Sequence, residues 1–175
     1  MNIDKLVREW YVVHTKNRFE NVVFESLQKK SLETFLPKIM VRSKRKDRRK
    51  MIRVPLFPGY LFVKTDLNPN EHLEIVKTTG AVRLIGNKAG PISVPEETVD
   101  SLKIIVATEN KVVTGSRFQK GDRVIVIAGP FTGVMGIFSR YKGQGRVVVH
   151  IDALGQFAAV DVSEEDVEKM PPIVT

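Results

Sequence analysis

The pattern of apolar and polar residues over the first 66 positions predicts a strand, a helix and a hairpin, in that order. Aromatic and β-branched residues at 10–13 (WYVV) indicate a buried strand. Charged residues, Glu20 among them, fall on the outer faces of the helix that follows. Two apolar runs, 34–42 and 51–66, flank a basic segment and are expected to form the arms of a hairpin with the charges at its tip. The apolar positions of the helix share one face: Phe19, Val22, Val23 and Leu27.

Two further helices and a short strand are predicted before residue 107. Asn68 can cap the first of these helices, Pro69 fits its first position, and Glu71 completes a capping-box-like pattern. A strand follows at 81–86, and the next helix is expected to open at 93–96. The first helix takes its apolar face from Leu73, Val76 and Ile75 and stops at Gly80, and the second takes its face from Val99, Leu102 and Val106.

The pattern of apolar and polar residues changes after residue 107. Residues 108–117 (TENKVVTGSR) are polar and aperiodic, which predicts a flexible linker. Four short β-rich runs then alternate with glycine-containing turns, a pattern typical of a small barrel: RVIVI, VMGIF, RVVVHI and FAAVDV. The predicted fold class is α+β, with an N-terminal antiparallel sheet flanked by helices at 8–107, the linker at 108–117 and a small C-terminal β-barrel at 118–170.

Composition excludes several classes of protein. The 175 residues include no cysteine, so disulfides and cysteine-ligated zinc are excluded. No apolar run approaches the ~18 residues of a membrane span, and the first residues do not form a secretory signal. The three histidines lie far apart, and neither HExxH nor G-x-S-x-G occurs, so no enzyme, metal or cofactor is predicted. We expect a monomeric, cytoplasmic protein with no membrane partner.

The net charge of +8 is concentrated in one short segment. Residues 108–175 hold eight basic and eight acidic side chains, whereas 42–53 (RSKRKDRRKMIR) holds eight basic and one acidic. Such a patch attracts the phosphates of DNA or nascent RNA through counterion release. The alternative is a solvated loop tip that only adds solubility. The candidate nucleic-acid-binding residues are Arg42, Lys44, Arg45, Lys46, Arg48, Arg49, Lys50 and Arg53.

A group of aromatic residues follows the basic segment. Alternate residues of a strand point to opposite faces of a sheet, so Tyr60 and Phe62 share a face. Gly59 after Pro58 permits a turn or bulge that supports Tyr60. The residues expected to border this face are Tyr11, His14, Val99 and Leu102. Composition alone favours an ordinary core here.

The order of elements and four motifs resemble the NusG family. WYVVHTKNRFE at 10–20 looks like the family's opening strand and helix, and LFPGYLFV at 56–63 is similar to its most characteristic segment. VKTTGAVRLIG at 76–86 is similar to the helix-to-strand passage that follows, and KGDRVIVIAGPFTGVMGIF at 120–138 resembles a KOW motif. The resemblance covers nearly the whole chain from Trp10 onward.

This resemblance implies a transcription elongation or antitermination factor that binds RNA polymerase. Family members hold the clamp helices of the polymerase in an apolar depression, and their KOW domain binds a small-subunit ribosomal protein or Rho. The polymerase-binding residues implied are Tyr11, His14, Phe57, Pro58, Tyr60, Phe62, Val99 and Leu102. The partner-binding residues implied in the KOW domain are Phe131, Thr132, Gly133 and Phe157.

Some details of the resemblance leave alternatives open. LFPGYLFV, with FLPKI at 35–39, is more similar to specialised RfaH-type paralogues than to the housekeeping pattern. Lys16 and Arg18 either meet nucleic acid, as polar and basic residues of this region do in the family, or are ordinary surface charges. Phe157 is either a partner contact or core. The alternative function is an RNA-binding or ribosome-associated KOW module that uses the basic hairpin.

Overall fold

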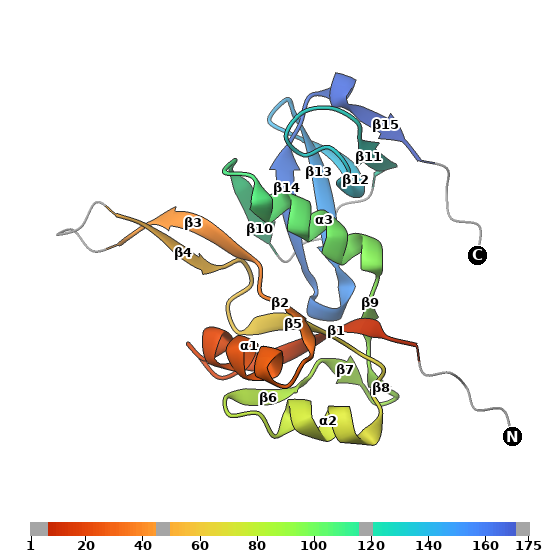
Figure 1. Cartoon of the computed structure of the whole chain (residues 1–175). Helices are drawn as coiled ribbons and strands as arrows, with labels where there is room; N and C mark the ends of the chain where they lie inside the picture. The colour runs from red at the N-terminus through yellow and green to blue at the C-terminus, as the bar shows by residue number, and fades with distance from the viewer. Residues whose placement is uncertain (1–6, 45–49, 116–120, 171–175) are drawn as a thin grey trace, which may run out of the picture. The chain divides into compact units, whose positions relative to one another are not determined.

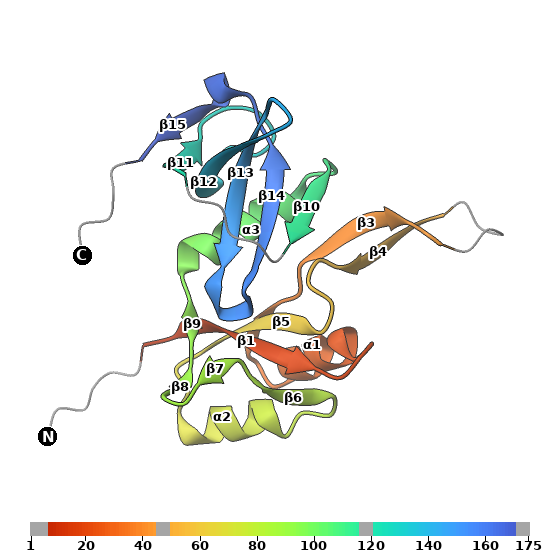
Figure 2. The ribbon, with the colours of Figure 1, turned by 180° about the vertical axis from the view of Figure 1, so that it is seen from behind.

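The chain folds into two compact units that divide after Pro95. The computed structural model describes residues 7–44, 50–115 and 121–170. We call 1–95 the N-terminal unit and 96–175 the C-terminal unit. Each contains an antiparallel sheet and helix, as Figures 1 and 2 show from opposite sides, so the predicted α+β fold class is confirmed.

A five-stranded antiparallel sheet organises the N-terminal unit. Its order is β2 (Glu33–Phe35), β5 (Tyr60–Thr65), β1 (Glu9–Thr15) and β6 (Ala81–Leu84), and β9 (Ser93–Val94) also pairs with β1. Strand β1 lies inside the sheet with neighbours along both edges, and its apolar residues at 10–13 are all buried, as the sequence predicts.

Two helices contribute to the core on one face of this sheet (Figure 1). From α1 (Glu20–Lys29), Val23 and Leu27 join the core, and from α2 (Pro69–Val76), Ile75 does so. They pack with alternate residues of β1 and β5, including Val13 and Leu61. Every second residue of the strands and every third or fourth residue of the helices therefore pack together in a single core.

The predicted face of α1 is confirmed at Val23 and Leu27 but not at Val22, and the predicted face of α2 is wrong at Leu73. In α1 the buried positions are Glu20, Val23 and Leu27, whereas Val22 is 43 % exposed. In α2 only Ile75 is buried, and Leu73 is 58 % exposed. The predicted cap of α2 is confirmed, because the Asn68 side-chain oxygen accepts a hydrogen bond from the Glu71 N–H at 2.9 Å. A helix of eight residues presents few positions to the core, and α2 contributes one buried isoleucine.

The predicted hairpin is confirmed as a separate two-stranded sheet, which we call the ribbon. β3 (Lys38–Arg42) pairs with β4 (Met51–Pro55) and with no other described strand, and the ribbon extends away from the N-terminal sheet (Figure 1, orange). The predicted run 34–42 is thus shared between two sheets, because Leu36–Pro37 interrupts it. A smaller pair, β7 (Gly86–Asn87) and β8 (Gly90–Pro91), follows β6.

The C-terminal unit is a six-stranded curved sheet, the predicted small barrel (Figure 2). Its order is β10 (Val112–Gly115), β14 (Gln156–Asp161), β13 (Gln144–Ile151), β12 (Met135–Tyr141), β11 (Arg123–Val126) and β15 (Val167–Lys169). Four residues predicted as linker therefore form β10, which pairs with β14 from Val112↔Val160 to Gly115↔Phe157. Two 3₁₀ turns, Asp152–Leu154 and Glu164–Asp166, complete the unit.

The third helix, α3 (Glu96–Ala107), is grouped with the barrel, whereas the sequence-based limits placed it in the first domain. Arg123 on β11 donates to both carboxylate oxygens of Glu97 at 2.7 Å. The Ser101 hydroxyl oxygen accepts from the Met135 N–H at 3.0 Å. These polar contacts fasten α3 to the outside of β11 and β12. The domain limits themselves stay a prediction.

Candidate functional site

The turn that leads into β5 presents a partly exposed aromatic face. Pro58 is exposed, and Tyr60 and His14 are half-buried. His14 and Tyr60 are register partners in the β1–β5 pair, and their rings stack with centroids 5.1 Å apart. Gly59 takes a φ of 87°, a left-handed conformation that glycine adopts without steric cost. The structure therefore brings three of the predicted polymerase-binding residues together on one surface.

Two of the predicted aromatic contacts are not exposed. Phe57 is 1 % exposed and Phe62 is 0 % exposed, so neither ring lies open as the sequence-based interpretation required. Phe62 pairs with Val12 in the centre of the sheet, and its ring lies 5.9 Å from that of Phe35. The expectation of two exposed rings is therefore wrong, because both belong to the buried core.

Tyr11 does not border this face either. It pairs with Val63, one position away from Phe62, and it packs in the core under α1 and α2. Since Tyr11 and His14 are three residues apart in a strand, they point to opposite sides of the sheet. Val99 and Leu102 are buried on α3 in the C-terminal unit, and their part in polymerase binding stays a prediction.

The ribbon has two chemically different faces. Ile39 lies opposite Val54 and Val41 opposite Ile52, which makes one face apolar. On the other face Met40 lies opposite Arg53, and Arg42 opposite Met51, so cations alternate with methionines. Lys44 and Lys50 extend the positive charge toward the tip.

No acidic residue occurs in the described part of the ribbon and its flanks, 38–44 and 50–55. Within the described residues, no carboxylate pairs with Arg42, Arg53, Lys44 or Lys50, and all four are exposed. The tip cations Arg45, Lys46, Arg48 and Arg49 lie outside the described residues. Lys16 and Arg18 are exposed at the turn before α1, where Arg18 takes a φ of 65°.

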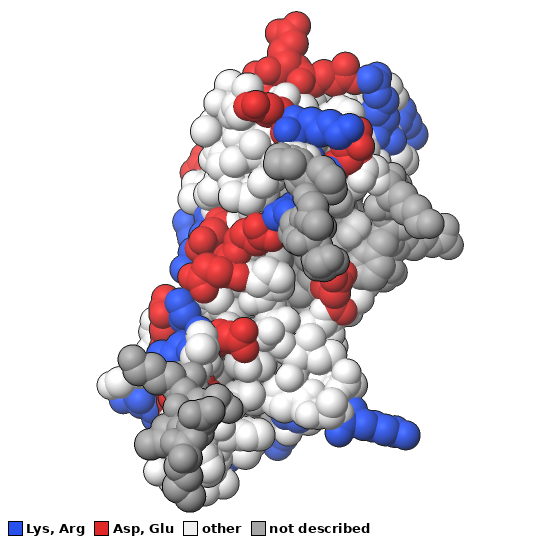
Figure 3. Space-filling view, turned by 90° about the vertical axis from the view of Figure 1, so that its right-hand side faces the viewer, with Lys and Arg blue, Asp and Glu red and all other residues white. Residues whose placement is uncertain are grey.

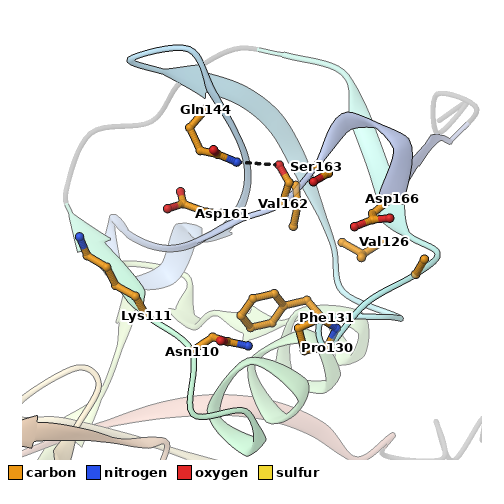
Figure 4. Close-up of a pocket in the computed structure, with 11 residues that line it drawn as sticks. Asn110, Lys111, Val126, Pro130, Phe131, Gln144, Asp161, Val162, Ser163 and Asp166 are labelled. Atoms are coloured by element: carbon orange, nitrogen blue, oxygen red, sulfur yellow. Dashed lines mark hydrogen bonds between the residues drawn. The ribbon is translucent and has the colours of Figure 1, made fainter.

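A pocket of about 340 Å³ opens on the barrel beside the predicted KOW partner residues (Figure 4). Phe131 lines this pocket but is only 5 % exposed, so it is not the exposed anchor that the sequence suggested. Thr132 is exposed, whereas Gly133 and Phe157 are half-buried. Asp161, Asp166 and Lys111 add charged groups to the wall, so the pocket combines an apolar floor with a mixed polar rim (Figure 4).

Charge on the barrel is largely paired. Arg146 donates to Asp161 at 2.8 Å, and Arg140 forms an ion pair with Glu164. The half-exposed ring of Tyr141 has the Arg146 guanidinium 4.6 Å from its centroid. Figure 3 shows acidic and basic side chains intermixed on one side of the barrel. The barrel thus presents no uniform field of one sign on that side.

The described residues offer neither a metal site nor a membrane-spanning helix. The described residues contain no group of three or more His, Asp or Glu side chains placed to hold a metal ion. None of the helices in the described ranges is long and apolar enough to cross a membrane.

The aromatic face, the acid-free cationic ribbon and the pocket on the barrel are candidate binding surfaces of a protein built from two units. A sequence model described as "Transcription termination factor nusG" matches residues 8–103. The chain therefore belongs to the NusG family. It is 28 % identical to the transcription termination/antitermination protein NusG of Thermus thermophilus over 92 % of this chain and 98 % of that protein. It is 30 % identical to NusG of Chlamydia pneumoniae over 94 % of this chain and 96 % of that protein.

A solved structure agrees with the fold. The structure described as "Domain interaction in Thermotoga maritima NusG" matches 95 % of this chain and 99 % of that chain, with a TM-score of 0.53 and 23 % identity. At this identity the match concerns the fold alone.

Proposed function

We propose that this chain is a transcription elongation and antitermination factor that binds the clamp helices of RNA polymerase through the face formed by His14, Pro58 and Tyr60. Membership of the NusG family and relatives named for transcription termination and antitermination support this function. The observation that carries the site is the half-exposed Tyr60 ring stacked on His14. The protein acts as a cytoplasmic monomer, and no enzymatic step belongs to the proposal.

The stacked Tyr60 ring is a rigid anchor. An aromatic ring held in place by a stacked neighbour loses little conformational entropy when a partner covers it, and such rings dominate binding energy at interfaces. A factor that binds only the closed, elongating form of the polymerase shifts the population toward that form. Suppression of pausing or termination then follows from binding alone.

Replacement of the anchor tests the proposal. We expect Tyr60→Ala to weaken binding to RNA polymerase about tenfold or more, as loss of a central aromatic anchor does. Tyr141→Ala removes a partly exposed tyrosine from the barrel and is expected to bind as the wild type does. Equal affinity of wild type and Tyr60→Ala, in an equilibrium binding assay with purified polymerase, would contradict the proposal.

The ribbon supplies a second contact in this function. Its unpaired cations suit phosphates of DNA or nascent RNA in the elongation complex, because counterion release rewards each neutralised phosphate. Lys16 and Arg18 extend this contact. If ribbon variants keep polymerase affinity while Tyr60→Ala loses it, the alternative of a plain RNA-binding module is excluded.

The finer assignments concern specialisation and the barrel partner. We infer an RfaH-type paralogue from LFPGYLFV, FLPKI and the basic ribbon, although the relatives named above carry the general NusG name. Transcript profiles of a deletion strain test this, since a specialised factor changes few operons. The barrel takes a small-subunit ribosomal protein or Rho through Thr132 and neighbouring residues, and pull-downs with purified partners decide between them.

A further inference from the structure

A buried carboxylate lies behind the turn that presents Tyr60. Glu20 is the first residue of α1, and it is 7 % exposed. Its Oε1 accepts a hydrogen bond from the N–H of Gly59 at 2.8 Å, across 39 positions of sequence. Burial of a carboxylate is costly unless a donor compensates for the lost water. A contact of this kind links the helix directly to the turn.

Gly59 is held from two sides. Its N–H bonds to Glu20, and its carbonyl oxygen accepts from the N–H of Thr15 on β1 at 2.8 Å. Glycine is the residue with the most conformational freedom, and a φ of 87° is one of many conformations open to it. Two hydrogen bonds therefore select a single conformation for a turn that would otherwise sample several.

The exposed groups flank this glycine. Pro58 precedes it, and the N–H of Tyr60 closes the turn on the carbonyl of Phe57 at 3.1 Å. His14 stacks on Tyr60, and the position of a Cβ on Gly59 would lie 3.9 Å from the His14 ring. A change in the Gly59 conformation would therefore move both Pro58 and the Tyr60–His14 stack.

The helix itself does not explain the carboxylate. The N-cap residue of α1 is Phe19, which makes no side-chain cap, and Glu20 directs an oxygen to Gly59 instead of to the first turn of its own helix. An acidic residue in the first helical turn already gains a modest energy from the helix dipole when it lies on the helix surface, so this gain does not require burial. The burial of Glu20 thus serves the turn.

We propose that Glu20 is a positioning residue for the polymerase-binding face. Its carboxylate preorganises the turn at Gly59, so that Pro58 and Tyr60 are presented in the conformation that the partner binds. This proposal rests on the proposed function of the Tyr60 face. It assigns a role in recognition to a residue that touches no partner.

Glu20→Gln and Glu20→Asp separate the effect of side-chain length from the effect of charge. Glu20→Gln keeps the length of the side chain and an oxygen that accepts from the Gly59 N–H, but it removes the charge. Glu20→Asp keeps the charge but is one methylene shorter, so it cannot make the same bond. In the full chain we expect Glu20→Gln to bind polymerase within about threefold of wild type, and Glu20→Asp and Glu20→Ala to bind about tenfold more weakly, since an unfixed turn must be ordered on binding.

Val23→Ala is the matched control for stability. Val23 is buried in the core one turn later on the same helix, and its truncation lowers the melting temperature without contact to the turn. We expect Val23→Ala to melt at least as early as Glu20→Asp and yet to keep wild-type affinity at a temperature where both are folded.

The outcomes distinguish the proposals. If Tyr60→Ala binds as wild type does, the proposed function fails, and the role of Glu20 fails with it. If Tyr60→Ala loses binding but Glu20→Asp and Glu20→Ala keep it, only the positioning role is overturned. Loss of affinity by Val23→Ala in proportion to its melting temperature also overturns that role, because the effect would then follow stability. Rescue by Glu20→Gln alone supports it.

Discussion

The ribbon and the β12–β13 hairpin of the barrel are both antiparallel strand pairs that carry several cations. They differ in whether carboxylates pair with those cations. In the ribbon, Arg42 and Arg53 share a face, and no carboxylate pairs with them among the described residues. In the hairpin, Arg140 pairs with Glu164, and Arg146 pairs with Asp161.

The difference shows that a count of cations does not give the availability of charge. A phosphate that approaches the ribbon displaces water and mobile counterions, which favours binding. A phosphate that approaches the barrel must first displace a carboxylate that is already in place. The same residue types therefore predict a polyanion surface in one unit and an electrically balanced surface in the other.

The largest expected effect comes from neutralising the ribbon. We expect a quadruple variant to bind a short DNA duplex at least about tenfold more weakly than wild type at low salt: Arg42→Gln, Lys44→Gln, Lys50→Gln and Arg53→Gln. The slope of log binding constant against log salt concentration should become less negative by about 0.9 for each lost phosphate contact. Fluorescence anisotropy at several salt concentrations measures both quantities.

The control neutralises three exposed cations elsewhere in the N-terminal unit, Lys29→Gln, Arg83→Gln and Lys88→Gln, and it is compared with the ribbon variant per charge removed. An equal loss in this control would mean that net charge alone, and not the ribbon, attracts the nucleic acid.

A smaller effect is expected from removing the carboxylates that pair with arginines on the barrel. Asp161→Asn with Glu164→Gln frees Arg146 and Arg140, and in the ribbon-neutral background it should raise duplex affinity by roughly threefold, because two cations become available. The free energy of unfolding should change by about 1 kcal/mol, since the Arg140–Glu164 pair is exposed and only Arg146 in the other pair is half-buried. No gain in affinity would show that the barrel surface excludes nucleic acid by shape as well as by charge.

The smallest effect is expected from adding a cation to the barrel by protonation. Burial lowers the pKa of His150 below its ordinary 6.5, with the nearby Asp152 opposing the shift. The unfolded chain therefore binds more protons than the folded state as the pH falls through 6.5, and the folded state loses stability over that fall. Thermal unfolding of His150→Asn should lack this component, whereas both proteins should show it equally if another group is responsible.

Much of the fold could be predicted because its signals are local. The buried strand at 10–13, the Asn68 cap and the four barrel runs each appear in a few adjacent residues, and each is confirmed. Short strands at the margin of a sheet are harder to predict from the sequence. The sequence of β10 predicts a linker because VVT is short and its neighbours are polar, and only pairing with β14 makes it a strand.

The candidate site could be predicted in part. The sequence brought Tyr60 and His14 to one surface, and the structure stacks them. It placed Tyr11 there as well, although a separation of three residues in a strand sends the side chain to the opposite side. The charge of Glu20 predicts exposure, and its partner Gly59 lies too far along the chain for any local pattern to show the hydrogen bond.

Strand β10 has a practical consequence for dissection of the chain. It forms one margin of the six-stranded sheet and covers the open side of β14. A fragment that begins at residue 118, where the barrel was expected to start, would lose this strand and expose the backbone donors and acceptors of β14, which invites edge-to-edge aggregation. Truncations intended for solution work on the barrel should therefore begin before Val112.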